Sequence, residues 1–367
     1  MSAPKPRVLF VDDEPQVVEA LSASLRKLRK SWNMSFATGG PAALETIRTE
    51  HFDVVVSDMR MPVVDGEMVL LAAAARHPST IRIILSGQTE RAVAVRTTSV
   101  AHRFLSKPCR VDDLQACLDG LLAIVQPLSP TTRDIVCAVG TLKPARATLA
   151  RLVALVNDPN ADPDEIVRCI EHDFALAGKL LHCAGAGFFA KHQPVTSVRH
   201  AISTIGADAL RLFVLSLTGR DDDGTAALYS HALATARGLV HMTGDPHAFL
   251  CGVLHGLGKL ALADQLGPSY LEVVAEASAT GRDLAELEME RFGVGHDEIG
   301  AHLVELWGIA PPIARAIRGH CQPTADADPL ARALHVACAA AHGSTRLVEE
   351  VASRDAMLAL RDWLATP

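Results

Sequence analysis

The 367-residue sequence has few aromatic residues and no long apolar run. Phe, Trp and Tyr make up 4% of the chain, so its cores must be built from Ala, Leu, Val and Ile, which suits helical packing. No stretch of 18 or more residues is apolar and uncharged throughout, so we expect no membrane partner. The beginning, MSAPKPRVLFVDDEP, becomes acidic before the apolar region of a signal peptide could form. We therefore expect a soluble, cytoplasmic protein.

The cysteines are not spaced for a zinc ribbon or a disulfide scaffold, and the basic residues do not form a face for nucleic acid. The eight cysteines include no CxxC pair, which argues against a zinc ribbon or a disulfide scaffold and favours buried thiols in a reducing compartment. The 35 Lys and Arg residues are outnumbered by 42 Asp and Glu residues, which gives a formal net charge of −7. Because no basic face is visible, we expect no direct nucleic-acid binding.

The length and the patterning indicate more than one domain. Residues 1–125 alternate short apolar runs with amphipathic segments, which predicts an α/β doubly wound fold with a parallel five-stranded sheet. The expected strands are 7–12, 34–38, 53–58, 81–85 and 103–106, and the expected helices are 16–30, 41–50, 67–76 and 111–125. Pro127 and Pro130 mark a boundary, so we expect a linker over 126–134.

Beyond residue 130 the strand signals vanish, and Ala/Leu/Val patterns of helical period predict an all-α second half. The expected helices are 145–157, 163–172, 175–184, 198–205, 207–216, 226–242, 247–264, 270–280, 284–292, 296–307, 311–320 and 329–341. We assign residues 135–340 to one all-helical domain and 341–367 to a C-terminal helical tail.

Carboxylates follow two of the expected strands. Asp12 and Asp13 come after the first strand, and Asp58 ends the third. Because ligands bind at the carboxyl ends of parallel strands, these side chains predict a site for a hard cation such as Mg²⁺. Ser86 and Lys107 end two further strands and would supply a hydroxyl and an ammonium for the oxygens of a phosphoryl group.

The runs VLFVDDEP, VVVSDMRMPVVDG, IILSG and FLSKP carry these residues. Together they resemble the receiver domain of two-component response regulators over about residues 5–125. The resemblance implies a CheY-like fold and a sensor histidine kinase or a phosphotransfer protein as the partner. It also implies that the face formed by 86–98 and 104–118 responds to phosphorylation by docking on a second receiver, which would make a homodimer, or on the helical half.

The same resemblance implies a role for each residue of the site. Asp58 would be the phosphoacceptor, Asp13 a direct Mg²⁺ ligand and Asp12 a ligand through water. Asp58 itself and the backbone carbonyl of Arg60 would complete the protein ligands. The remaining positions are the hydroxyl switch, the aromatic switch and the phosphoryl-binding lysine, which fall on Ser86, Phe104 and Lys107.

Most of the 16 histidines lie in the helical half, and four of them are candidate metal ligands. They form two pairs with a spacing of 24 residues, and each lies on or at the end of an expected helix: His231 with His255, and His296 with His320. Imidazoles from packed helices could converge on a metal ion. This spacing alone does not establish a site.

The runs HALATARGL, LHGLGKLAL and GHDEIGAHLVELWGIAPPIARAIRGH resemble the HD-related output domain, HDOD, over about residues 135–340. This family is related to HD and HD-GYP phosphohydrolases. The resemblance places His231, His255, His296 and His320 at metal-binding positions of those enzymes and Lys259 at a phosphate-contacting position. Gly256 stands where the enzymes carry the aspartate of the His-Asp pair, Cys321 replaces a histidine, and no GYP tripeptide follows.

Two functions from different classes remain. The first is a response regulator phosphorylated on Asp58, whose HDOD domain is not catalytic and acts through a protein partner. The alternative is a metal-dependent phosphohydrolase or cyclic-dinucleotide phosphodiesterase with a degenerate site. Gly256 favours the first, because glycine has no ligand atom for a metal. A third function, a transcription factor, is disfavoured because acidic residues also outnumber basic ones after residue 125.

Overall fold

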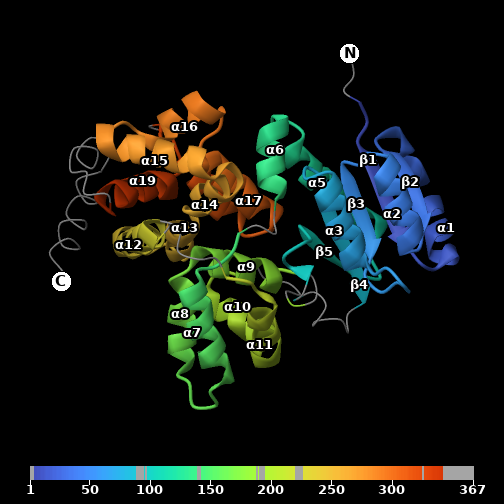
Figure 1. Ribbon diagram of the computed structural model, residues 1–367, viewed down its shortest axis with the longest axis horizontal. Helices are drawn as coiled ribbons and strands as arrows, with labels where there is room; N and C mark the ends of the chain where they lie inside the picture. Colours follow the sequence, from blue (N-terminus) through green and yellow to red (C-terminus); the bar gives the residue numbers. More distant parts are fainter. Residues whose placement is uncertain are drawn as a thin grey trace. The chain divides into compact units, whose positions relative to one another are not determined.

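The computed structural model describes residues 4–87, 97–138, 142–186, 195–219, 226–324 and 326–341, together with Val95 and Phe189. The chain divides into two compact units (Figure 1), one of residues 1–140 with 186–191 and the other of 141–185 with 192–367. Most of the expected signalling face at 86–98, and the expected tail beyond Ala341, lie outside the described residues.

The first unit is built on a five-stranded parallel sheet, as predicted. Its strands pair in the order β2-β1-β3-β4-β5. They are β1 (Arg7–Asp12), β2 (Asn33–Thr38), β3 (Val54–Asp58), β4 (Ile81–Gly87) and β5 (Arg103–Lys107). Strands β1 and β3 are buried almost throughout, because apolar runs such as VLFV and VVV lie between helical layers.

Helices cover the sheet, and the connections determine their faces. They are α1 (Pro15–Ser24), which continues as a 3₁₀ segment η1 (Leu25–Lys30), α2 (Gly40–Thr49), α3 (Gly66–Arg76) and α5 (Val111–Val125). The chain runs outward from β1 to β2 and then back across to β3, so right-handed connections place α1 opposite α2 and α3. Trp32 Nε1 donates a hydrogen bond to Asp119 of α5, at 3.2 Å, which joins α5 to the α1 side.

A helix that begins inside the expected linker belongs to the first unit. Helix α6 (Pro130–Cys137) is capped by Ser129, whose hydroxyl accepts a hydrogen bond from the Thr132 amide. The guanidinium of buried Arg82, on β4, donates to the Cys137 carbonyl at 2.7 Å. His102 accepts from the Arg82 amide through Nδ1 and lies 3.2 Å from the same carbonyl through Nε2. These bonds hold the end of α6 against the sheet.

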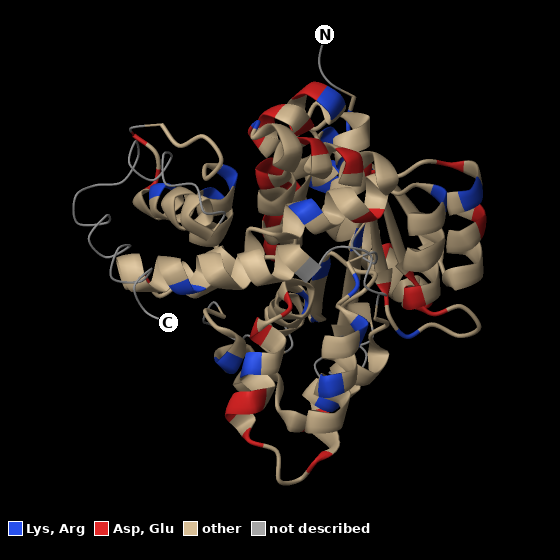
Figure 2. Ribbon diagram, turned by 60° about the vertical axis from the view of Figure 1, so that its left-hand side comes forward, with Lys and Arg blue, Asp and Glu red and all other residues tan. Residues whose placement is uncertain are grey.

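The second unit is helical in its described part, as predicted. Its helices are α7 (Arg146–Asn157), α8 (Pro163–Glu171), α9 (Phe174–Ala184), α10 (Val198–Ile205), α11 (Ala207–Ser216), α12 (Ala226–Thr243), α13 (Ala248–Leu254), α14 (Leu257–Leu266), α15 (Pro268–Thr280), α16 (Leu284–Phe292), α17 (His296–Leu306), α18 (Pro311–Arg318) and α19 (Pro329–Ala341). Among the described residues, none of the helices combines the length and the apolar character needed to cross a bilayer. Figure 2 shows basic positions interspersed with acidic ones on the described elements.

The prediction of one helix over 247–264 is wrong, because α13 and α14 are separate helices that meet at His255 and Gly256. The apolar pattern of the sequence continues through His255 and Gly256, but the helical backbone hydrogen bonding is interrupted there. Nδ1 of His255 lies 2.6 Å from the carbonyl oxygen of Gly252, which an uninterrupted helix would bond to the amide of Gly256. The side chain therefore competes with the helix for this carbonyl.

Helices α14 and α17 approach each other through two glycines. A Cβ atom at Gly258 would lie 1.8 Å from the backbone oxygen of His296, so only glycine fits there. Gly300 faces the same contact, and a Cβ on it would lie 3.3 Å from the Gly258 nitrogen. This close packing places the first turn of α17 directly against α14.

We predict that Gly258→Ala lowers the free energy of unfolding of the helical unit by about 3 kcal/mol or more, because a backbone atom cannot move aside as a side chain can. The matched control is Gly120→Ala on α5, where a Cβ atom meets nothing within 4 Å. It should raise stability by about 0.5–1 kcal/mol through helix propensity. Calorimetric unfolding of both variants checks this, and equal effects would contradict the packing argument.

Candidate functional site

Acidic side chains and a lysine meet at the carboxyl end of the sheet. Strands β1 and β3 are neighbours, so Asp12 and Asp58 end adjacent strands, and both are buried. Lys107 ends β5, and its long side chain reaches both carboxylates. Its Nζ lies 2.8 Å from Asp12 Oδ2 and also hydrogen-bonds Asp58 Oδ1. The three predicted residues therefore form one charged cluster.

Burial and the Lys107 ammonium shift the pKa of Asp58 in opposite directions. Burial raises the pKa of Asp58, and Asp12 raises it further, while Lys107 and the Arg60 amide only partly offset this. For Lys107, burial alone would lower the pKa, but the hydrogen bonds and charges of the two carboxylates outweigh it and raise the value. The cluster thus keeps the Asp58 carboxylate partly desolvated beside a protonated amine.

The other predicted residues of this site lie on the same sheet or directly after its strands. Asp13 directly follows β1 and is partly exposed, and the Arg60 amide donates to Asp58 Oδ2 at 2.7 Å. Ser86 is buried near the end of β4, one residue beyond the Leu85 that pairs with Asp58. Phe104 is also buried, and it pairs with Ile84 in the β4–β5 register.

The loop after Asp58 folds back tightly on its own strand. The Gly66 amide donates to the Met59 carbonyl at 3.0 Å, and a Cβ on Gly66 would lie 2.2 Å from the Asp58 carbonyl oxygen. Val63, at the exposed tip, has a φ of 70°. A β-branched residue rarely adopts this left-handed conformation, so the loop beside the acidic cluster is held under local strain.

In the helical unit the four candidate histidines lie next to one another. The ring centroids of successive members are 5.2, 5.4 and 5.6 Å apart in the order His231, His255, His320, His296. They come from α12, the α13–α14 junction, the end of α18 and the start of α17. All but His231 are fully or almost fully buried.

Two cysteines join the histidines. Cys321 Sγ lies 3.4 Å from His296 Nε2, and Cys338 Sγ lies 3.3 Å from His231 Nε2. The sequence comparison placed Cys321 at a histidine position, but it did not find Cys338. The position of Cys338 on α19 gives no local signal, because it reaches the cluster through the packing of α19 against α12, α13 and α18.

The two remaining positions of the expected HD-like site are Gly256 and Lys259. A Cβ atom on Gly256 would meet the ring of Phe174 at 3.2 Å. That ring stacks on Tyr229 with centroids 4.3 Å apart. An aromatic pair therefore occupies the space beside the position of the missing aspartate. Lys259 is buried on α14, and its charge contributes to a lowered pKa of His255 after burial and the neighbouring imidazoles.

The chain carries a His-Asp dipeptide at 172–173, and its aspartate has a structural role. Asp173 accepts a hydrogen bond from the Leu176 amide at 3.0 Å and so caps α9. It also accepts from the Ala145 amide at 2.8 Å, which fixes the start of α7.

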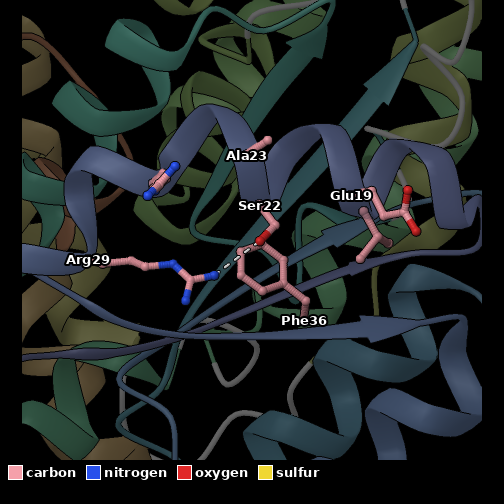
Figure 3. A pocket seen from close by; sticks show the side chains of 7 residues that line it. Glu19, Ser22, Ala23, Arg29 and Phe36 are labelled. Atoms are coloured by element: carbon pink, nitrogen blue, oxygen red, sulfur yellow. Dashed lines mark hydrogen bonds between the residues drawn. The ribbon is translucent and has the colours of Figure 1, made fainter.

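A surface pocket is lined by residues that belong to neither cluster. It is formed by α1, η1 and β2 and is lined by Val18, Glu19, Ser22, Ala23, Arg26, Arg29 and Phe36 (Figure 3). Arg29 donates to the Ser22 hydroxyl at 3.2 Å across it. None of the predicted site residues lines this pocket, so it does not add to either cluster.

Two families match the chain, one in each unit. Residues 8–119 match the response regulator receiver domain, and residues 142–323 match the HDOD domain. Among solved structures, the MmoQ response regulator from Methylococcus capsulatus strain Bath is 30% identical with a TM-score of 0.50. That similarity covers 60% of this chain and 98% of that chain.

Three other proteins are less similar to this chain in sequence. A virulence factor from Campylobacter jejuni, 18% identical with a TM-score of 0.50, covers 61% of this chain and 91% of its own and shows a shared fold alone. The transcriptional regulatory protein ZraR from Escherichia coli K12 is 27% identical over 198 residues. An uncharacterised protein from Treponema pallidum is 28% identical over 186 residues. The chain spans 44% and 36% of the lengths of these last two.

The acidic cluster gives a pH-dependent prediction. In chelator, Lys107→Met should lower the free energy of unfolding of the first unit by about 1–3 kcal/mol at pH 7, because two buried carboxylates lose their cation. The raised pKa of Asp58 rises further without the ammonium. The loss should therefore shrink as the pH falls through that pKa, since the protonated carboxyl needs no counter-charge.

Urea unfolding at pH 7 and pH 5 measures this difference, with the exposed Lys27→Met as the control that should change little. An equal loss at both pH values would show that Lys107 acts through packing rather than through charge.

Proposed function

Because the chain belongs to the response regulators, with an N-terminal receiver domain and a C-terminal HDOD domain, we propose that it relays a phosphoryl signal through Asp58. The observation that carries the proposal is the Lys107 ammonium held between Asp12 and Asp58 at adjacent strand ends. This arrangement provides a nucleophilic carboxylate, an acidic cation site and a positive group for phosphoryl oxygens in one place. The phosphoryl donor would be a sensor histidine kinase or a phosphotransfer protein.

In the proposed reaction, an oxygen of the Asp58 carboxylate attacks the phosphorus of the donor. The bond from phosphorus to the donor breaks, and an acyl phosphate forms on Asp58. Lys107 then pairs with the phosphoryl oxygens in place of the free carboxylate. Ser86, near the end of β4, and Phe104, near the start of β5, are the residues proposed to change position in response.

The donor set suits a hard cation, since it consists of carboxylate and carbonyl oxygens. Asp12, Asp13, Asp58 and the Arg60 backbone carbonyl are the groups proposed to hold Mg²⁺. The ion would neutralise the charge that develops on the phosphoryl oxygens. Lys107 already compensates part of the negative charge, which keeps the two buried carboxylates close enough to act together.

For the helical unit we propose an output function through a protein partner rather than hydrolysis. The support is Gly256, where the side chain that would complete an HD site is absent and Phe174 lies in its direction. The proposal is independent of the chemistry at Asp58, since the two sites lie in different units.

The phosphoacceptor is tested with acetyl phosphate and Mg²⁺. Wild-type protein should become labelled, Asp58→Asn should not, because an amide is a poor nucleophile, and chelator should prevent labelling of the wild type. The matched control is Asp112→Asn, an exposed aspartate on α5, which should be labelled normally. Stoichiometric, acid-stable labelling of Asp58→Asn would refute the assignment.

The output proposal is tested by direct assay. Purified wild-type protein should not hydrolyse cyclic dinucleotides or phosphomonoesters when Mn²⁺ or Fe²⁺ is supplied. Turnover that disappears in His255→Ala, with the fold retained by circular dichroism, would establish the phosphohydrolase alternative instead.

A further inference from the structure

Two buried histidines of the helical unit are fixed in one tautomer. Nδ1 of His255 and Nδ1 of His320 each lie 2.6 Å from a backbone carbonyl, those of Gly252 and Ile317. A carbonyl can only accept, so Nδ1 carries the proton in both rings. In a neutral imidazole the other ring nitrogen is then an acceptor. Their Nε2 atoms therefore carry lone pairs.

His296 is oriented in the same way by a carboxylate. Its Nδ1 lies 2.6 Å from Glu288 Oε2, and its backbone amide donates to the same oxygen at 2.7 Å. The Tyr270 hydroxyl donates to the other oxygen of this carboxylate, Oε1, at 2.7 Å. A carboxylate behind a histidine is the arrangement that aims Nε2 at a metal ion.

Each of the two cysteines faces two Nε2 atoms. Cys321 Sγ lies 3.4 Å from His296 and 3.7 Å from His320, and Cys338 Sγ lies 3.3 Å from His231 and 3.9 Å from His255. Imidazole nitrogen and thiolate sulfur are the ligands that zinc prefers, so a cation between the three atoms of each group would bind all of them.

The spacing agrees with a tetrahedral zinc ion. Bonds of about 2.05 Å to nitrogen and about 2.3 Å to sulfur place the two ligand atoms about 3.6 Å apart. The four sulfur–nitrogen distances, between 3.3 and 3.9 Å, lie on both sides of this value. In each group the three candidate ligand atoms all lie within 4.8 Å of one another.

We propose that the helical unit binds zinc at two sites with two histidines and one cysteine each: His231, His255 and Cys338 in one, and His296, His320 and Cys321 in the other. The thiol proton leaves to solvent as the metal–sulfur bond forms. The thiolate then supplies the negative charge that the glycine at the HD position cannot. Three protein ligands leave one position of a tetrahedral ion open. This inference does not depend on phosphorylation of Asp58.

The donor types favour zinc over the hard cations of hydrolytic HD sites. Thiolate and imidazole select zinc-class metals, whereas Mg²⁺ and Mn²⁺ prefer carboxylate and carbonyl oxygens.

The test uses the full chain, purified with reductant, stripped with chelator and titrated anaerobically with Co²⁺ as a spectroscopic substitute for zinc. We expect a thiolate-to-cobalt charge-transfer band and about two equivalents of zinc retained after gel filtration of a zinc-loaded sample. Cys321→Ser and Cys338→Ser should each lose about half of the band and one zinc equivalent. Glu288→Gln should weaken the zinc affinity of the Cys321 site about 10–100-fold.

The matched control is Cys109→Ser, a partly exposed cysteine of the first unit, which should keep the band and both equivalents. The wild-type spectrum decides the question even if a variant unfolds. Absence of both the charge-transfer band and retained zinc in the wild type would overturn the proposal. So would a band unchanged in the folded Cys321→Ser/Cys338→Ser double variant, which would place the metal elsewhere.

Discussion

The approach of α14 to α17 at Gly258 is the contact on which the arrangement of the helical unit depends. With no side chain between them, the two backbones meet at the first residue of α17. That residue is His296, so the contact carries its imidazole toward the α13–α14 junction, where His255 lies. A larger residue at position 258 would separate the helices and with them the histidines. Helix packing, rather than any local motif, therefore creates this cluster.

In both units, most polar groups of the clusters described above are paired when they are removed from water, and the pairing orients them. In the receiver, Lys107 lies between two carboxylates and keeps them together. In the helical unit, carbonyls and Glu288 hold the Nδ1 atoms of the buried histidines. The pairing fixes which atom of each side chain remains available, so the requirement for stability also determines the chemistry.

The receiver fold could be predicted closely from the sequence, because apolar runs such as VLFV alternate with helical patterns and polar residues mark the strand ends. The residues of the acidic cluster could be predicted for the same reason, since parallel strands bring their ends together. The break at His255 could not, because it depends on a side chain that competes for the Gly252 carbonyl. Nor could Cys338, which is 83 residues from His255 and reaches it only through helix packing.

The hydrogen bond from Arg82 to the Cys137 carbonyl determines where a stable receiver fragment can end. Burial lowers the pKa of Arg82 only to about 10, so it stays charged at neutral pH inside the sheet and needs every acceptor it has. The Val100 and Thr80 carbonyls supply two, and the end of α6 supplies another. A receiver fragment that stops at Val125, the end of α5, would lack the Cys137 carbonyl. The buried guanidinium of Arg82 would then lose one of its hydrogen-bond acceptors. The autonomous fragment should instead extend through α6.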